Sequence, residues 1–200
     1  MNEGDCLNNK IAGLVIKLYH YVLVSFYFWL GLLRGIFIYA LIPALVALYL
    51  TLDHMKQNPE YAESELKQVY QQNYKKYQHH KLSSFLISFM FILLATVIFF
   101  LYKAEANWIW IGIVSYFSLL LYTTVSYATF YFAFKTNEIK ASFALGFVSV
   151  IKNLSITVSI VVLFVLMLWL AFYNLILFIV LSPLLFGLMV VYVFPKKLHN

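Results

Sequence analysis

His20 and Arg34 are candidate functional residues whose ionisable side chains lie in or beside long apolar runs. His20 lies within the first such run. An ionisable group there is a candidate for binding a ligand or a proton, and the alternative is a hydrogen bond to a neighbouring helix. Arg34 lies in the segment Gly31-x-x-Arg34-Gly35. Its charge is expected to reach water or to pair with Glu105, and the functional alternative is contact with an external partner or a sugar.

Two prolines, Pro43 and Pro183, interrupt apolar runs at matching places. Each follows a polar residue by nine positions, Arg34 in one case and Asn174 in the other. Each proline is expected to kink its helix and to free one carbonyl group. Matching interruptions point to a binding site in transporters, whereas the alternative is that both prolines bend helices for packing.

No set of catalytic, cofactor-binding or metal-binding residues is predicted. The apolar runs contain no carboxylate, so paired acids for hydrolysis or proton coupling are missing. His79 and His80 are adjacent and are therefore expected on different faces of a helix, which disfavours a shared metal. Cys6 is the only cysteine and cannot form an intrachain disulfide. No phosphate-binding glycine loop is present, which excludes ATP hydrolysis by this chain.

The amino-acid composition indicates a membrane protein. The 200 residues include only 14 basic and 8 acidic side chains, 64% are apolar, and the mean hydropathy is +0.85. Soluble domains are roughly a quarter charged. This composition excludes a soluble enzyme, a nucleic-acid-binding domain and a disordered tail, and it favours one multi-pass membrane domain over residues 1–200.

The uncharged stretches predict six transmembrane helices, because about 20 apolar residues cross a bilayer. Strands are disfavoured, since the alternation of a barrel is missing, so an all-α fold is expected. Phe172-Tyr173-Asn174 is the expected break in the 43-residue uncharged run from Asn153 to Pro195. The predicted spans are 11–33, 36–52, 82–102, 108–134, 153–172 and 175–194.

The distribution of basic residues predicts the orientation. If residues 53–81 are cytoplasmic, both termini and residues 135–152 are cytoplasmic too, and twelve basic residues lie inside. Only Arg34 and Lys103 then lie outside. This bias follows the positive-inside rule and predicts an N-in, C-in protein.

Two amphipathic helices are predicted on the cytoplasmic side, at 59–79 and 137–152. The first is expected to begin at Asn58-Pro59-Glu60, where Asn58 would cap the helix. The apolar stripe predicted for the first helix is Leu66, Val69, Tyr70, Tyr74 and Tyr77; that of the second is Ile139, Phe143, Phe147 and Ile151.

The two halves of the chain predict a parallel internal repeat. Glu65-Leu66-Lys67 and Glu138-Ile139-Lys140 open the two cytoplasmic helices. Each helix precedes an apolar hairpin that begins with Leu-Ser, at Leu82 and at Leu154. Both units begin inside, so the repeat is parallel rather than inverted.

Several segments together resemble the YesL family of small bacterial membrane proteins. The residues that carry the resemblance are Ile42-Pro43-Ala44-Leu45-Val46-Ala47-Leu48-Tyr49, Asn73-Tyr74-Lys75-Lys76, Lys140-Ala141-Ser142-Phe143-Ala144-Leu145 and Lys152-Asn153-Leu154-Ser155-Ile156-Thr157. The resemblance implies a location in the bacterial inner membrane. It also implies a role beside the permeases of ATP-driven carbohydrate importers, and it supplies no catalytic residue.

Three functions follow as hypotheses. The first is a non-catalytic accessory or assembly subunit that binds the permease of a carbohydrate importer within the lipid bilayer. The second is a stand-alone transporter or channel for a small solute. The third is a regulator of a membrane sensor kinase. The sequence does not separate the first from the third.

Overall fold

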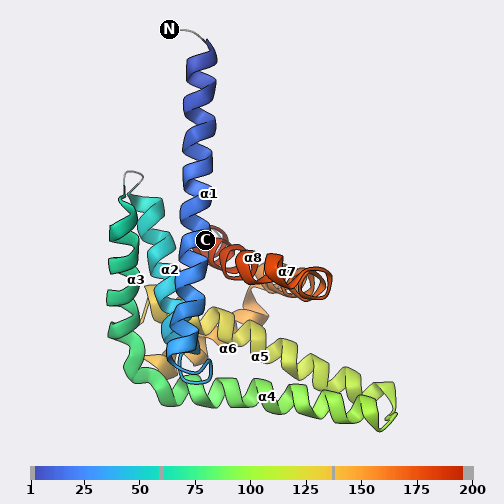
Figure 1. The fold of residues 1–200 in the computed structure, drawn as a ribbon. Coiled ribbons are helices and arrows are strands. Elements are labelled where there is room, and N and C mark those ends of the chain that lie inside the picture. Colours follow the sequence, from blue (N-terminus) through green and yellow to red (C-terminus); the bar gives the residue numbers. More distant parts are fainter. Residues whose placement is uncertain (1–2, 59–60, 137, 196–200) are drawn as a thin grey trace.

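The structure is a computed structural model that describes residues 3–58, 61–136 and 138–195, with side chains from residue 11 onward. Every element in these ranges is helical, which confirms the all-α prediction (Figure 1). The elements are α1 (Glu3–Arg34), α2 (Leu41–Gln57), α3 (Glu63–Tyr77), the 3-10 helix η1 (Gln78–His80), α4 (Lys81–Lys103), α5 (Trp108–Phe134), α6 (Ile139–Lys152), α7 (Leu154–Tyr173), α8 (Leu175–Leu188) and the π-helix η2 (Met189–Val193).

The membrane class is supported by five helical segments. In the described part of the chain, five segments are long and apolar enough to cross a bilayer: Ile11–Arg34, Glu63–Lys103, Trp108–Phe134, Leu154–Tyr173 and Leu175–Val193. The break expected near residue 174 is confirmed. Asn174 begins α8, and its Oδ1 accepts hydrogen bonds from the amides of Ile176 and Leu177 at 3.0 and 3.1 Å. This side-chain cap stabilises the new helix start.

The predicted span 36–52 differs from the observed helix α2. Residues 35–40 form a turn, and α2 runs from Leu41 to Gln57, five residues further along. Its 17 residues are fewer than the roughly 20 that cross a bilayer. The structure therefore does not confirm six spans.

Helix α2 is instead the centre of the molecule. It contacts α1, α3, α4, α5 and α8, and eleven of its residues are buried. Small side chains such as Ala44 and Ala47, both fully buried, let neighbouring helices come close. On α8, a Cβ added to Gly187 would meet the end of the Leu52 side chain. Gly187 therefore leaves room for this side chain between α2 and α8.

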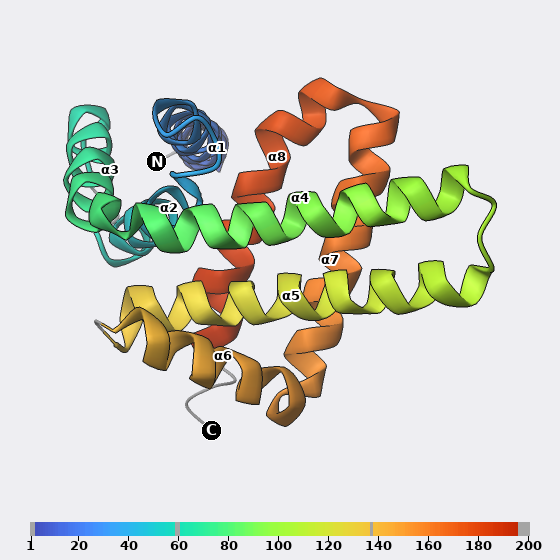
Figure 2. The ribbon, with the colours of Figure 1, turned by 90° about the horizontal axis from the view of Figure 1, so that it is seen from below.

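The helices form crossed hairpins rather than a parallel bundle. In Figure 1, α1, α2 and α3 stand side by side, while α4 and α5 extend crosswise from their lower end. Figure 2 shows α7 and α8 crossing α4 and α5 in a third direction. In α5, residues 123–132 are buried near the base of its hairpin, whereas Trp108 and Trp110 at the tip are exposed. Each hairpin is anchored at one end and projects at the other.

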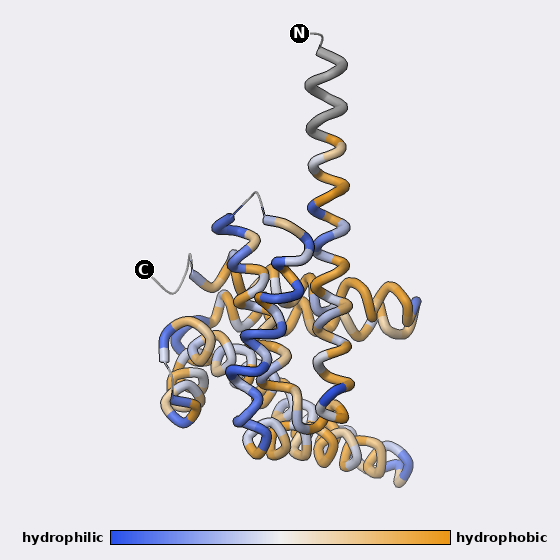
Figure 3. Tube along the Cα trace, turned by 60° about the vertical axis from the view of Figure 1, so that its left-hand side comes forward, coloured by the Kyte–Doolittle hydropathy of each residue, from blue (hydrophilic) through white to orange (hydrophobic). Residues whose placement is uncertain are grey.

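Helix α3 confirms most of the first amphipathic helix. Figure 3 shows its hydrophilic residues against the mainly hydrophobic hairpins. Four members of the predicted stripe are buried, and Val69 is half-buried. The start is wrong: Asn58 follows α2 as its C-cap, and Ala62 precedes α3, because α2 extends as far as Gln57. Residues 59 and 60 lie outside the described ranges.

Helix α6 exists as predicted, beginning at Ile139, but its predicted apolar stripe packs only in the first half, where Ile139 and Phe143 are partly buried against the core. Phe147 and Ile151 are exposed, and the buried residues are Ser142, Gly146, Ser149 and Val150. A Cβ added to Gly146 would lie 2.9 Å from the backbone of both Thr124 and Ala128 on α5. Small residues allow this close approach, as between helices in a membrane, and Phe147 and Ile151 face outward.

The substitution Gly146→Ala tests this contact. Because the added methyl meets backbone atoms of α5, we expect it to destabilise the protein by about 1–3 kcal/mol. Gly112→Ala is the matched control, since Gly112 is also in a helix and a Cβ there has no neighbour within 4 Å. The free energy of unfolding of the control is expected to rise by up to about 1 kcal/mol, because alanine has a higher helix propensity than glycine. Unfolding of the detergent-solubilised protein measures both, and equal effects would contradict the α5–α6 packing.

Candidate functional site

The four candidate residues fall into three places in the structure. Arg34 and Pro43 line one pocket, Pro183 lines another, and His20 lies apart from both. Charged and polar side chains line part of the first pocket, whereas the second is almost entirely apolar.

The first pocket, called the basic pocket below, has a volume of about 470 Å³. It lies where the end of α1, the end of α3 and the start of α4 meet. Three cationic side chains reach it from these three elements, and no carboxylate lines it. Its lining residues are Arg34, Gly35, Ile36, Tyr39, Pro43, Tyr74, Lys75, Gln78 and Lys81.

The turn between α1 and α2 shapes one wall of the basic pocket. The amide of Phe37 donates to the Leu32 carbonyl at 2.8 Å, and the amide of Ile36 donates to Leu33 at 3.1 Å. This is the Schellman pattern of a helix end, which usually places glycine at the left-handed position. Here Ile36 occupies it with a φ of 52°, followed by Phe37 at 59°. A β-branched residue is strained in this conformation.

Side chains from two other helices hold this turn in place. The Tyr74 hydroxyl of α3 donates to the Gly31 carbonyl at 3.0 Å. From α4, the Ser88 hydroxyl donates to the Ile38 carbonyl at 3.2 Å, and Ser84 accepts from the Ile42 amide at 3.2 Å. The backbone groups that the end of α1 and the start of α2 leave open are thus partly satisfied from α3 and α4.

The position of Arg34 corrects two expectations. It was predicted on the opposite side of the membrane from residues 53–81, yet it lines one pocket with Lys75 and Lys81. A pocket of this size cannot connect the two faces of a hydrocarbon core about 30 Å thick. The proposed pairing with Glu105 is also wrong. Glu105 lines a different pocket with Lys103 at the far tip of the α4–α5 hairpin.

Pro43 does not kink its helix. It is the third residue of α2, within the first turn, where an amide would have no partner inside the helix. The predicted equivalence of Pro43 and Pro183 therefore fails at Pro43, because α2 begins later than the uncharged run does.

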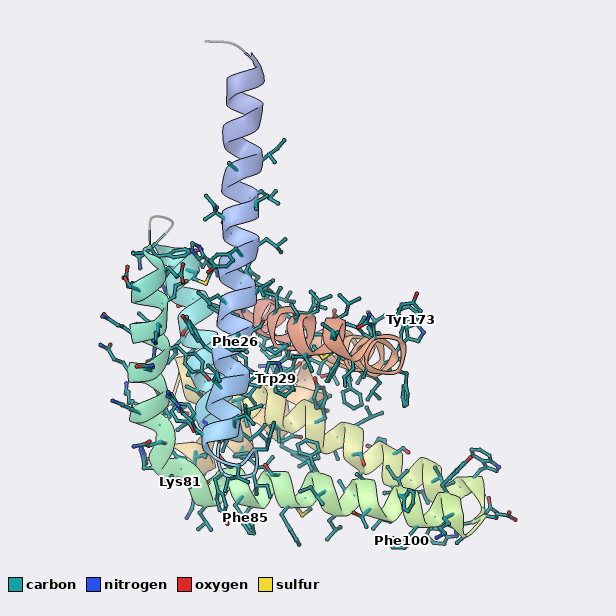
Figure 4. All side chains as sticks on the ribbon, viewed as in Figure 1. Phe26, Trp29, Lys81, Phe85, Phe100 and Tyr173 are labelled. Carbon is teal, nitrogen blue, oxygen red and sulfur yellow. The ribbon has the colours of Figure 1, made fainter. Side chains whose placement is uncertain are left out.

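Pro183 behaves as predicted and frees a carbonyl inside α8. A residue with an amide at position 183 would donate to the carbonyl of Ile179, four residues earlier. Instead, the indole Nε1 of Trp29 on α1 donates to this carbonyl at 2.6 Å. Trp29, labelled in Figure 4, lies where α1 passes α8. The bond ties α1 to the interrupted helix.

Pro183 and Trp29 also line an apolar pocket of about 280 Å³ between α1, α2, α4, α5, α7 and α8. The side-chain hydroxyls in its lining belong to Tyr122, Ser126 and Ser182, and Ser126 donates to the carbonyl of Tyr122 on its own helix at 2.7 Å. This lining suits a hydrocarbon chain or an apolar side chain.

His20 makes ring contacts and does not form the predicted helix-to-helix hydrogen bond through Nδ1. Its ring lies edge-on to Tyr61, with centroids 5.2 Å apart, and its buried Nδ1 has no hydrogen-bond partner in the described part of the chain. His79 and His80 do not point apart as predicted, since the 3-10 turn η1 brings their ring centroids within 3.9 Å. Within the described ranges, no three His, Cys, Asp or Glu residues form a group that could hold a metal ion.

The comparisons with known proteins do not identify a family for this chain. No family model, curated protein or solved structure matches this chain. The resemblance to the YesL family therefore stays a prediction.

A double-mutant cycle tests the bond between Trp29 and the Ile179 carbonyl. Trp29→Phe is expected to lower the free energy of unfolding by about 1–3 kcal/mol, because it leaves the carbonyl without a donor in an apolar setting. In a Pro183→Ala background the same substitution is expected to cost clearly less, because the restored amide at position 183 serves that carbonyl. Equal costs in both backgrounds would contradict the assigned hydrogen bond.

Proposed function

We propose that this chain is a non-catalytic accessory or assembly subunit of an ATP-driven carbohydrate importer, and that it binds the permease within the bilayer. The resemblance to the YesL family motivates the substrate class. The uncovered apolar surface of the projecting helices supports a partner within the membrane.

This uncovered surface is the observation that carries the proposal. In α1, the side chains of residues 11–19 are exposed and include Leu14 and Ile16. On α7, Val162, Leu166 and Trp169 are exposed at more than half of their surface. Lipid covers such faces in any membrane protein, but helices that project singly or in pairs from a small core also offer long faces for packing against other helices.

The bacterial inner membrane and the sidedness belong to the same proposal. Both termini, residues 53–81 and residues 135–152 would face the cytoplasm, as the basic residues indicate. The parallel repeat then pairs α3 with the α4–α5 hairpin and α6 with the α7–α8 hairpin, so that each hairpin enters from the cytoplasm. We place the turn at 35–40 on the cytoplasmic side as well, because Arg34 shares a pocket with Lys75 and Lys81. Both ends of α1 would then lie on the cytoplasmic side, so α1 would not cross the bilayer, although its length and composition would allow it.

Cysteine labelling tests this sidedness. In a Cys6→Ser background, Glu105→Cys and Phe172→Cys place a thiol at the two hairpin tips, and Ile36→Cys places one at the first turn. A membrane-impermeant maleimide is expected to label the two tip variants in intact bacterial cells, and to label the Ile36 variant only after permeabilisation. Lys67→Cys is the cytoplasmic control. Labelling of the Ile36 variant from outside would contradict the placement of the first turn.

Co-purification tests the accessory role. The tagged full chain, expressed at its native level and extracted in mild detergent, is expected to bring down the permease subunits of a carbohydrate importer. An equally tagged multi-pass protein from the same membrane is the control. Recovery of a sensor kinase instead would favour the regulator, and recovery of the chain alone would contradict the proposal.

The alternative of a stand-alone transporter or channel has a separate test. Vesicles that contain only this chain would have to move a solute, and Pro183→Ala would have to change the rate. Pro43→Ala serves as the control, because Pro43 lies at the start of α2 rather than at an interruption. No flux across a broad panel of solutes would remove this alternative.

A further inference from the structure

We propose that the basic pocket binds the phosphate group of an anionic phospholipid, and that the acyl chains of this lipid lie along the exposed face of α4. The pocket has a volume of about 470 Å³ and opens beside the first turn of α4. The inference concerns a ligand of this chain itself and does not depend on binding to a permease.

The charges that line the pocket have no acidic partner among the described residues. Within the described ranges, the only ion pair joins His54 and Glu65, on α2 and α3. No hydrogen bond or ion pair to a described residue involves the charged ends of Arg34, Lys75 or Lys81. Three cations around one cavity repel one another, and a phosphate offers oxygen acceptors to all three.

The position of Lys81 is a second reason to expect an anion in this pocket. Arg34 and Lys75 lie in the last turns of α1 and α3, where a cation suits the negative end of the helix dipole. Lys81 is the first residue of α4, which is the positive end. An anion in the pocket would offset the charge of Lys81 and the dipole of α4 together.

The apolar surface next to the pocket favours a lipid over a soluble anion. Figure 4 shows Lys81 at the corner between α3 and α4, with Phe85 one turn further along α4. The ring of Tyr39, which lines the pocket, stacks on Phe85 with centroids 5.5 Å apart, and Phe85 stacks on Phe89 at 6.0 Å. Leu82 is 71% exposed on the same stretch of helix. Acyl chains that extend from a phosphate in the pocket would cover this row.

The strained turn lies at the edge of the same pocket. Ile36 lines it in the left-handed conformation, and such strain persists where surrounding contacts fix the backbone. The sidedness proposed above, on which this placement rests, puts the pocket on the cytoplasmic side, where the leaflet carries anionic lipids. The proposed side of the membrane therefore agrees with an anionic lipid as the ligand.

Native mass spectrometry of the purified full chain tests the proposal. The protein in detergent is titrated with phosphatidylglycerol, with phosphatidylcholine of the same chain length, and with inorganic phosphate. We expect phosphatidylglycerol to bind more tightly than phosphatidylcholine, and millimolar phosphate to leave it bound. No preference of the unsubstituted chain for phosphatidylglycerol would overturn the proposal. Displacement by inorganic phosphate would overturn the lipid assignment in favour of a free anion.

Two charge-matched triple variants locate the site. Arg34→Gln, Lys75→Gln and Lys81→Gln together are expected to weaken phosphatidylglycerol binding at least about tenfold, since each cation near an anionic headgroup contributes appreciably. Lys67→Gln, Lys140→Gln and Lys152→Gln remove the same charge from exposed positions outside the pocket. This control triple is expected to bind within about twofold of the parent. Equal weakening in both triples would overturn the site.

Two further measurements separate loss of the site from loss of the fold. Lys75→Arg with Lys81→Arg keeps the charges and is expected to retain binding. If the pocket triple unfolds, as judged by circular dichroism, the single variant Lys81→Gln replaces it. Unchanged affinity in that single variant would then overturn the role of Lys81 in the pocket.

Discussion

The burial of α2 among its neighbours is the constraint on which the rest of the structure depends. Successive points along this one helix are contacted by different elements. The amide of Ile42 donates to Ser84 of α4, and the hydroxyl of Tyr49 lies 3.4 Å from that of Thr129 on α5. Further along, Leu52 meets Gly187 of α8. Hairpins that each cover a different part of α2 cross one another, and their tips are left without protein neighbours.

Satisfaction of backbone groups explains how these irregular crossings are held. A helix end or interruption in an apolar setting needs a donor or acceptor from elsewhere in the protein. Trp29 donates to the carbonyl that Pro183 frees, and the Nζ of Lys56 donates to the Val191 carbonyl within the π-helix η2 at 3.1 Å. In both cases a side chain of α1 or α2 binds the last helix at a place where its regular bonding fails. The carbonyl groups left open by these helix interruptions are therefore also the points at which α1 and α2 bind the last helix.

Electrostatics and packing give α3 and α6 different environments, although both were predicted as amphipathic cytoplasmic helices. Helix α3 buries its tyrosine stripe and exposes its charges, so it behaves as a helix that faces water. Helix α6 buries serine and glycine against α5 and exposes Phe147 and Ile151, so its uncovered face is apolar. The basic pocket lies at the end of α3, beside the apolar start of α4, where a charged surface meets an apolar one.

The sequence by itself determined the helical class, the membrane character and most helix boundaries, because uncharged runs and the polar residues that end them act locally. It also indicated that Pro183 frees a carbonyl, since the rule depends only on positions four residues apart. Only the tertiary structure decided that Trp29 satisfies this carbonyl, that α2 is buried and begins at Leu41, and that Gly146 rather than Phe147 faces α5. Only the tertiary structure showed that Arg34 lines one pocket with Lys75 and Lys81. These outcomes depend on how closely separate helices approach and in which direction they cross, and neither quantity is encoded in the periodicity of any single segment.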